Sequence, residues 1–228
     1  MTSALIVAAG RGTRMGPNGD KLFLEVAGRP VVAHTWARFD AAAGIDDIIL
    51  VVRDTMQPAF ARLADTFRFR KPYRLVVGGQ ERQDSVWNGL QALAPDVTIV
   101  AIQDGARPCT SEGLIEETIR AALETGAGVA AQRVSDTLKE SDGGNLVSRT
   151  VDRSRLWAVQ TPQTFRVEVI VRALTAVRQQ GLLVTDDAAA CELIGQAVRL
   201  IESAAPNPKV TRSGDLAYAE VLLRQTGH

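Results

Sequence analysis

The chain has 228 residues, of which 46% are hydrophobic and 23% charged, with equal numbers of basic and acidic side chains. This length allows a substantial hydrophobic core, and the composition is ordinary for a globular protein. A formal net charge of zero gives no bulk electrostatic support for binding nucleic acid or an acidic membrane, so neither is expected as a partner.

The amino terminus and the cysteines predict a cytoplasmic protein. No basic segment precedes the first apolar run, Leu5-Ile6-Val7, which is too short for a signal peptide or a membrane span. The two cysteines, Cys109 and Cys191, suit a reducing compartment better than a disulfide framework. With only two histidines in the chain, histidine-based metal cages and nucleophilic triads are largely excluded.

Apolar strands alternate with helical patterns over the first half of the chain. Strands are expected near residues 4–8, 47–52, 73–77, 97–102 and 128–131, and helices near 31–40, 57–66, 82–94 and 111–124. This alternation predicts a Rossmann-like α/β fold, with a mostly parallel sheet and helices on both faces. Ligands bind such sheets at the carboxyl ends of the strands, so the loops after residues 8, 77 and 102 are expected to form the site.

The alternation breaks after Gln132. Residues 134–140 and 146–149 predict a β-hairpin around a glycine-rich turn. Because a two-stranded ribbon is marginal alone in water, we expect this β-arm, at about 134–155, to pair with a second copy in a homodimer. A solvent-exposed flap is the alternative. Helices near 167–180 and 185–194, a strand near 198–202 and a helix from 213 complete a single domain over 1–228.

The first strand leads into a basic glycine loop. Lys21 follows this loop, which reads Ala8-Ala9-Gly10-Arg11-Gly12-Thr13-Arg14-Met15-Gly16. Small residues let backbone N–H groups close around an anion, and cations neutralise the charge that develops when a phosphoryl group transfers. The loop is therefore typical of a protein that binds, and cleaves, a nucleoside triphosphate.

Two better-known phosphate loops fit this segment less well. A Walker loop needs Gly-Lys-Ser/Thr at its end, which is missing here. A dinucleotide fingerprint needs its third glycine where Met15 stands, and an acidic residue on the next strand, which reads Ile-Ile-Leu-Val-Val. A glycine turn without a ligand is a further alternative, but it does not require three nearby cations.

The loops after the third and fourth strands also carry polar residues. Gly79 suits close approach to a nucleotide base and Ser85 can hydrogen-bond its edge; a glycine turn with Ser85 on a solvated helix face is the alternative. Asp104 is well placed to hold Mg²⁺ through one carboxylate. A structural ion pair between Asp104 and Arg107 is the other interpretation.

The second half of the chain adds weaker signals. Thr137 and Arg153 flank the arm and suit a substrate phosphate, although exposed arm residues are commonly only solvated. Thr185 precedes an apolar helix and can equally be its N-cap. Lys209 follows an apolar strand, where its ammonium group can reach a reacting phosphate or simply lie on the surface.

Together these segments occur in the order and approximate spacing of one family. The chain closely resembles the 2-C-methyl-D-erythritol 4-phosphate cytidylyltransferases of the non-mevalonate isoprenoid pathway. The resemblance runs from the first strand to the last helix, and its further motifs are Asp104-x-Ala106-Arg107-Pro108, Asp136-Thr137, Thr150-Val151-Asp152-Arg153, Thr161-Pro162-Gln163, Thr185-Asp186 and Lys209-Val210-Thr211-Arg212.

The resemblance implies roles for these residues. Arg14 and Lys21 are expected to bind the triphosphate of CTP and stabilise the transition state, with Lys209 also catalytic. The expected nucleotide contacts are Ala8, Ala9, Gly10, Gly12, Gly79 and Ser85. Asp104 is expected beside Mg²⁺ and the substrate, and the remaining substrate-binding residues are Arg107, Thr161, Thr185, Asp186 and, from the partner subunit's arm, Thr137 and Arg153.

The implied reaction is in-line attack by the phosphate of methylerythritol 4-phosphate on the α-phosphorus of CTP, giving a CDP-alcohol and pyrophosphate. A ribitol-5-phosphate cytidylyltransferase, a sugar-1-phosphate nucleotidyltransferase and a non-catalytic CTP-binding module are the alternatives. The chain departs from the family pattern at Asp20, where proline is usual, and at Gln80 and Gly105.

Overall fold

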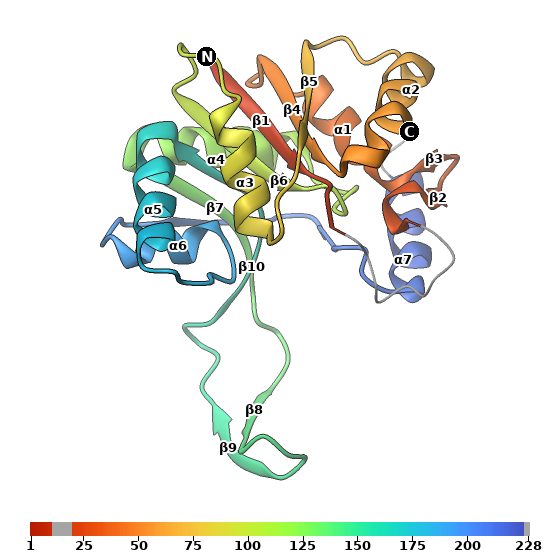
Figure 1. Cartoon of the computed structure of the whole chain (residues 1–228). Coiled ribbons are helices and arrows are strands. Elements are labelled where there is room, and N and C mark those ends of the chain that lie inside the picture. The colour runs from red at the N-terminus through yellow and green to blue at the C-terminus, as the bar shows by residue number, and fades with distance from the viewer. Residues whose placement is uncertain (11–19, 226–228) are drawn as a thin grey trace.

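The computed structural model describes residues 1–10 and 20–225 (Figure 1). Its centre is a seven-stranded sheet in the order β11-β7-β10-β6-β1-β4-β5. The strands of this sheet are β1 (Thr2–Val7), β4 (Asp47–Val52), β5 (Tyr73–Val77), β6 (Ile99–Asp104), β7 (Ala127–Arg133), β10 (Trp157–Arg166) and β11 (Arg199–Glu202). The helices are α1 (Val31–Ala41), α2 (Gln57–Phe67), α3 (Arg82–Gln91), α4 (Glu112–Thr125), α5 (Val167–Gln179), α6 (Asp187–Leu193) and α7 (Ser213–Gln225).

The sheet is mostly parallel, which confirms the predicted fold class. Strand β10 runs antiparallel between β6 and β7, whereas the other neighbouring strands of the sheet pair in parallel. Strand β10 was not expected from the sequence, since Pro162 in its middle normally argues against a central strand. The strand tolerates this proline where its register with β7 shifts, between Val159 and Gln163.

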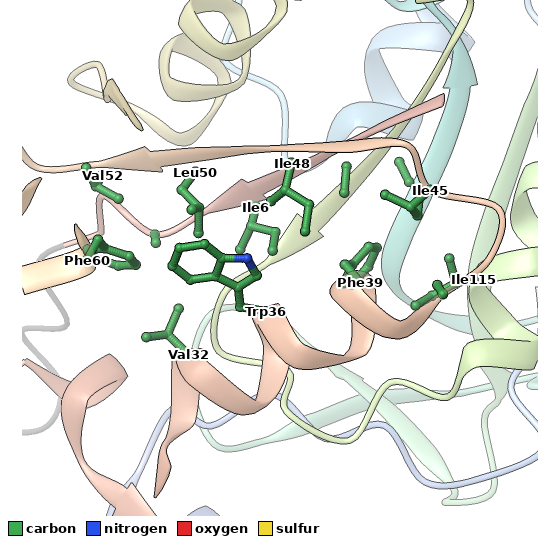
Figure 2. Packing of buried hydrophobic residues seen from close by; sticks show 14 of the residues in the cluster. Ile6, Val32, Trp36, Phe39, Ile45, Ile48, Leu50, Val52, Phe60 and Ile115 are labelled. Atoms are coloured by element: carbon green, nitrogen blue, oxygen red, sulfur yellow. The ribbon is translucent and has the colours of Figure 1, made fainter. Parts of the chain in front are cut away.

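Helices cover both faces of the sheet, so its central strands are apolar on both sides. Alternate residues of β1 point to opposite faces: Ile6 packs with α1, α2 and α4, and Leu5 packs with α3, α5 and α6. Trp36 of α1 lies at the centre of the first cluster (Figure 2), where its ring stacks on Phe69 with centroids 4.3 Å apart. This packing holds the carboxyl ends of the strands in fixed relative positions.

Short elements join the sheet to its periphery. The 3₁₀ helix η2 (Lys21–Phe23) precedes a small hairpin of β2 (Glu25–Val26) and β3 (Arg29–Pro30), and η3 (Asp54–Met56) follows β4. Helix α7 packs on this hairpin through a third apolar cluster that includes Val26, Val31 and Leu223. No helix in the described ranges is long and apolar enough to cross a bilayer.

The predicted arm is a ribbon of β8 (Leu138–Ser141) and β9 (Val147–Val151), which extends away from the sheet in Figure 1. Its first strand starts four residues later than expected and its second ends two residues later. Near its tip Leu146 is 86% exposed, and Val147 is also exposed. The arm therefore carries apolar side chains that its own chain leaves in solvent.

Two predicted helix boundaries differ from the structure by more than one residue. Helix α3 ends at Gln91, three residues earlier than predicted, and α6 starts at Asp187 instead of residue 185. Asp186 is the N-cap of α6, since its carboxylate accepts a hydrogen bond from the amide of Ala189 at 2.9 Å. The N-cap interpretation of Thr185 is therefore wrong by one residue.

Candidate active site

A cleft of ≈ 910 Å³ opens at the carboxyl ends of β1, β5 and β6, where the sequence predicted a site. Its walls come from the loops after these three strands and after β4, from η2 and from the segment before α7. Its lining includes eight of the predicted site residues: Ala8, Ala9, Gly10, Lys21, Gly79, Ser85, Asp104 and Lys209. The predicted residues Gly12 and Arg14 lie outside the described residues.

One wall of the cleft is built from small residues that pack very closely. A Cβ atom on Gly78 would lie 2.3 Å from the Cβ of Ala9, and one on Gly79 would lie 2.3 Å from the Cβ of Asp84. Only glycine fits at these two positions, because atoms with ordinary radii would overlap there. The backbone is therefore exposed to the cleft, as a wall that contacts a nucleotide requires.

Ser85 shapes this wall from within α3. Ser85 is only 3% exposed, and its hydroxyl accepts a hydrogen bond from the amide of Gly79 at 3.1 Å and donates one to the carbonyl of Glu81 at 3.2 Å. Asp84 completes a capping box with Glu81 at the start of the helix. The solvated helix face considered for Ser85 is therefore wrong, and its hydroxyl fixes the loop that it follows.

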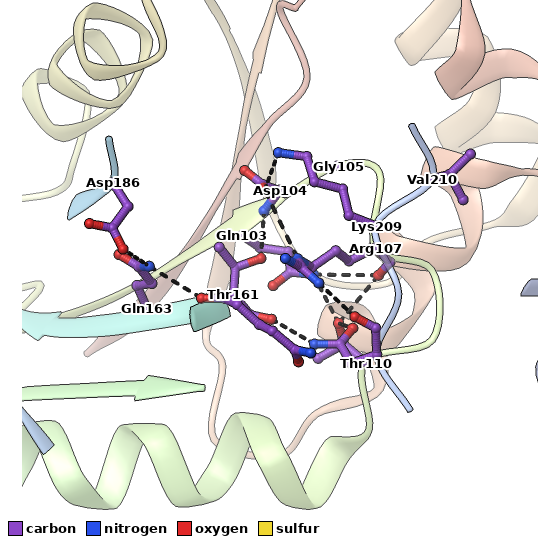
Figure 3. Close-up of polar contacts among 12 residues, drawn as sticks. Gln103, Asp104, Gly105, Arg107, Thr110, Thr161, Gln163, Asp186, Lys209 and Val210 are labelled. Carbon is purple, nitrogen blue, oxygen red and sulfur yellow. Dashed lines mark hydrogen bonds and ion pairs between the residues drawn. The ribbon is translucent and has the colours of Figure 1, made fainter. Parts of the chain in front are cut away.

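Asp104, the last residue of β6, lines the floor of the cleft, and Figure 3 shows the side chains of Lys209 and Arg107 next to it. Its Oδ2 is 2.7 Å from the Nζ of Lys209, and its Oδ1 is 3.1 Å from the Nε of Arg82. The Nε of Arg107 lies 4.0 Å from Oδ2. Burial alone would raise the pKa of Asp104, but the charges of Arg82, Lys209 and Arg107 outweigh it and hold the pKa well below its usual range.

Arg82 also belongs to this network, although no role was predicted for it from the sequence. Its guanidinium bridges two carboxylates, since Nη2 lies 2.8 Å from Oδ2 of Asp187 while Nε faces Asp104. Burial opposes its charge, yet the two carboxylates raise the pKa of Arg82. Asp187 is only 1% exposed, and its burial raises the pKa of its carboxyl against the opposing effect of Arg82. Arg82 is the first residue of α3, where a charged side chain is common, so the sequence gives no sign that it bridges Asp104 and Asp187.

Two lysines bring ammonium groups to the cleft from distant parts of the chain. Lys21 is the first residue of η2, and its Nζ donates to the carbonyl of Val210 at 3.2 Å. The amide of Val210 in turn donates to the carbonyl of Ala106 at 2.8 Å, which holds the Lys209 segment against the loop after β6. The contact with Val210 thus brings Lys21 to the segment that carries Lys209, and both predicted catalytic lysines line the same cleft.

Three further predicted substrate residues lie outside the cleft lining, and two of them, Arg107 and Thr161, contact Asp104. Arg107 is buried and donates to the carbonyl of Asn207 at 2.6 Å, and burial lowers its pKa. The hydroxyl of buried Thr161 accepts from the amide of Asp104 at 3.1 Å, and Asp186 accepts from the side-chain amide of Gln163 at 2.9 Å. Arg107 and Lys209 also line a second cavity of ≈ 280 Å³.

The other predicted substrate residues lie apart from the cleft lining. Thr185 is exposed before α6, and Thr137 and Arg153 are exposed at the base of the arm. Arg153 donates to the carbonyl of Ser135 across the base of the ribbon. Any contact of Thr137 or Arg153 with a ligand in this cleft therefore requires a second chain or a movement of the arm.

The donor set of the cleft bears on metal binding. Among residues 1–10 and 20–225, no group of three acidic, histidine or cysteine side chains lies close enough to hold a metal ion by itself. Asp104 offers one carboxylate at the cleft floor, and Mg²⁺ commonly binds proteins through one or two carboxylates with water and substrate phosphates as its other ligands. The site therefore fits Mg²⁺ that arrives with a polyphosphate.

Comparisons with known proteins agree over nearly the whole chain. The sequence profile of the 2-C-methyl-D-erythritol 4-phosphate cytidylyltransferase family matches residues 2–225. The enzyme of that name from Geobacillus kaustophilus is 45% identical over 220 residues, which is 96% of each chain. The one from Pelotomaculum thermopropionicum is 41% identical over 223 residues, covering 97% of this chain and 94% of the relative.

Solved structures show the same relationship. The 4-diphosphocytidyl-2C-methyl-D-erythritol synthase from Anaerococcus prevotii superposes with a TM-score of 0.86 at 31% identity, covering 98% of this chain and 96% of its own. The 2-C-methyl-D-erythritol 4-phosphate cytidylyltransferase from Thermus thermophilus gives 0.81 at 33% identity, with 97% and 98% covered.

The bridge from Arg82 to Asp187 predicts a stability that depends on pH when Arg82 is removed. In Arg82→Met the buried Asp187 carboxylate loses its cation, so it must bind a proton in the folded state. A carboxyl with a raised folded pKa stabilises the fold at low pH and loses that contribution as the pH rises. We expect urea unfolding to show a loss of about 3 kcal/mol near pH 8 and a smaller loss near pH 5.

The double variant Arg82→Met/Asp187→Asn is the control for this prediction. It removes the buried charge, so it should unfold with less dependence on pH and recover part of the stability near pH 8. Equal losses at both pH values, with no recovery in the double variant, would show that Arg82 does not compensate Asp187.

Proposed function

The chain belongs to the 2-C-methyl-D-erythritol 4-phosphate cytidylyltransferase family, and on that premise we propose how its cleft transfers CMP from CTP to 2-C-methyl-D-erythritol 4-phosphate. The products are 4-diphosphocytidyl-2-C-methyl-D-erythritol and pyrophosphate. The observation that carries the assignment of this cleft is the meeting of Lys21, Lys209 and Asp104 beside a wall of close-packed glycine backbone. We place the whole reaction in one domain over residues 1–228.

In this proposal the nucleotide binds in the cleft against the wall formed by Ala8, Ala9, Gly10 and Gly79. Exposed backbone N–H and carbonyl groups hydrogen-bond the base and the phosphates, and the close packing behind Gly78 and Gly79 leaves the wall no room to adapt. Lys21 then contacts the triphosphate. Its ammonium group exchanges the carbonyl of Val210, 3.2 Å away, for a phosphate oxygen.

The chemistry that remains is positioning and charge stabilisation. The acceptor's phosphate oxygen is already ionised at neutral pH, so the attack on the α-phosphorus needs no general base. Positive charges that are fixed before the reaction stabilise the charge that develops on the transferring phosphoryl group. Lys21 and, in this proposal, Arg14 supply that charge, while Lys209 holds the acceptor phosphate in line.

We assign the metal requirement to Asp104. When bound, Mg²⁺ neutralises phosphate charge and orients the phosphate oxygens. The residues of this chain hold the carboxylate ready for it: Arg82 contacts one oxygen of Asp104 and Lys209 the other. Lys209 is released from Asp104 when the acceptor phosphate takes its charge.

The arm completes the acceptor site from a second subunit in this proposal. Thr137 and Arg153 are exposed and lie outside the lining of their own chain's cleft, and the exposed Leu146 and Val147 give the arm an apolar surface to bury. A homodimer joined through the arm satisfies both features.

Unpaired Cys109 and Cys191 support a cytoplasmic location.

The first test is pyrophosphate release from CTP and Mg²⁺ with two acceptors, methylerythritol 4-phosphate and ribitol 5-phosphate, side by side. We expect the first acceptor to be strongly preferred. Preference for ribitol 5-phosphate would keep the chemistry and overturn the acceptor. CTP binding without pyrophosphate release from either acceptor would favour a non-catalytic module.

The second test asks whether each active site combines residues from two subunits. Lys21→Ala should lower turnover by about a hundredfold because it removes a charge that stabilises the transition state. Arg153→Ala should weaken binding of the acceptor. At an acceptor concentration too low for Arg153→Ala to bind it, each variant alone should have little activity. When the two variants are mixed under these conditions, about a quarter of wild-type activity should return, since half of randomly formed dimers are mixed and each has one intact site. Confirmed mixed dimers without activity would place Arg153 outside the partner's site.

A further inference from the structure

Asp20 and Arg53 form an ion pair beside Lys21 that none of the roles above uses. Asp20 precedes η2, and Arg53 follows β4 at the carboxyl edge of the sheet. One carboxylate oxygen of Asp20 contacts the guanidinium of Arg53. The other accepts a hydrogen bond from the amide of Leu22 at 3.1 Å, so Asp20 is the N-cap of the turn that carries Lys21.

The rest of this turn is anchored independently. Leu22 is buried in the first apolar cluster, and the ring of Phe23 packs edge-on against Phe60 of α2 at 5.3 Å between centroids. The amide of Phe23 donates to the carbonyl of Asp20 at 2.8 Å. The backbone after Lys21 is therefore held by the core, and the backbone before it is held by Asp20 and its partner Arg53.

The pair also neutralises the carboxylate charge of Asp20 next to the Lys21 ammonium group. A carboxylate one residue from Lys21 would attract that ammonium group and repel a polyphosphate. The Asp20 side chain is only 10% exposed and that of Arg53 is 31% exposed, so their mutual attraction is less screened than that of a pair in open solvent. Arg53 and Lys21 both line the cleft, which places the compensation at the site itself.

We propose that the Asp20–Arg53 ion pair positions Lys21 for the triphosphate: Arg53 holds Asp20 in its capping position and cancels the carboxylate charge that would oppose the nucleotide. Arg53 is thus a positioning residue, which acts through Asp20 and not by touching CTP. The inference rests on the proposed role of Lys21 toward the triphosphate.

The positioning is tested first without any ligand. Hydrogen exchange at the amides of Leu22 and Phe23 reports whether the turn is held. Arg53→Met should speed this exchange by roughly fivefold, the scale of weakening an N-cap. Arg74→Met is the matched control, because it breaks a comparable ion pair that lies outside the cleft lining. In that pair, Nη2 of Arg74 on β5 lies 2.9 Å from Oδ2 of Asp47 on β4. Unchanged exchange in Arg53→Met overturns the proposal, whether or not the protein turns CTP over.

The charge effect is tested with CTP and methylerythritol 4-phosphate. Arg53→Met should raise the KM for CTP by about tenfold with a smaller change in kcat, and Arg74→Met should leave both unchanged. Adding Asp20→Asn, which keeps the cap but removes the charge, should recover most of the loss. A double variant no better than Arg53→Met would show that Arg53 contacts CTP itself and would overturn the proposal. If wild type and Arg74→Met are inactive, the proposed function fails, and the exchange experiment still decides the role of the pair.

Discussion

The compensation of charge around Asp104 is the interaction on which this site depends. A cleft that binds a polyphosphate needs several cations, yet cations brought together in a folded protein repel one another and lose hydration. One largely buried carboxylate resolves this conflict, because it contacts Arg82 and Lys209 directly and lies near Arg107. Asp187 compensates the far side of Arg82 from α6. The same contacts that compensate these cations therefore also join β6, α3, α6 and the segment before α7.

The sheet supplies the frame for this network. Parallel strands end at the same edge, so loops far apart in the sequence converge there without special contacts between them. Buried residues on both faces of β1 and β4 fix those strand ends. The Asp20–Arg53 pair follows the same logic at a second point of the rim, where a carboxylate is again matched by a cation.

Much of this arrangement was predictable from local patterns. The strand ends near residues 8, 77 and 102 and the protruding arm leave signals within a few residues of chain. Strand β10 left no such signal, because Pro162 normally argues against a central strand. The register shift that accommodates this proline depends on the pairing with β7, which is distant in the sequence. The ion pair of Arg82 and Asp187 left no such signal either, because the two residues are far apart in the sequence. Each is the first residue of a helix, where a polar side chain is common. The burial of Ser85 and Thr161 likewise depends on tertiary packing.

Asp104 organises the cations of the cleft and, in our proposal, the metal for transfer. The decisive measurement is the turnover of Asp104→Asn at saturating CTP, Mg²⁺ and methylerythritol 4-phosphate, because asparagine keeps the shape of the side chain and removes its charge. We expect kcat to fall by about a hundredfold or more while the protein still folds. A kcat close to that of the wild type would contradict it.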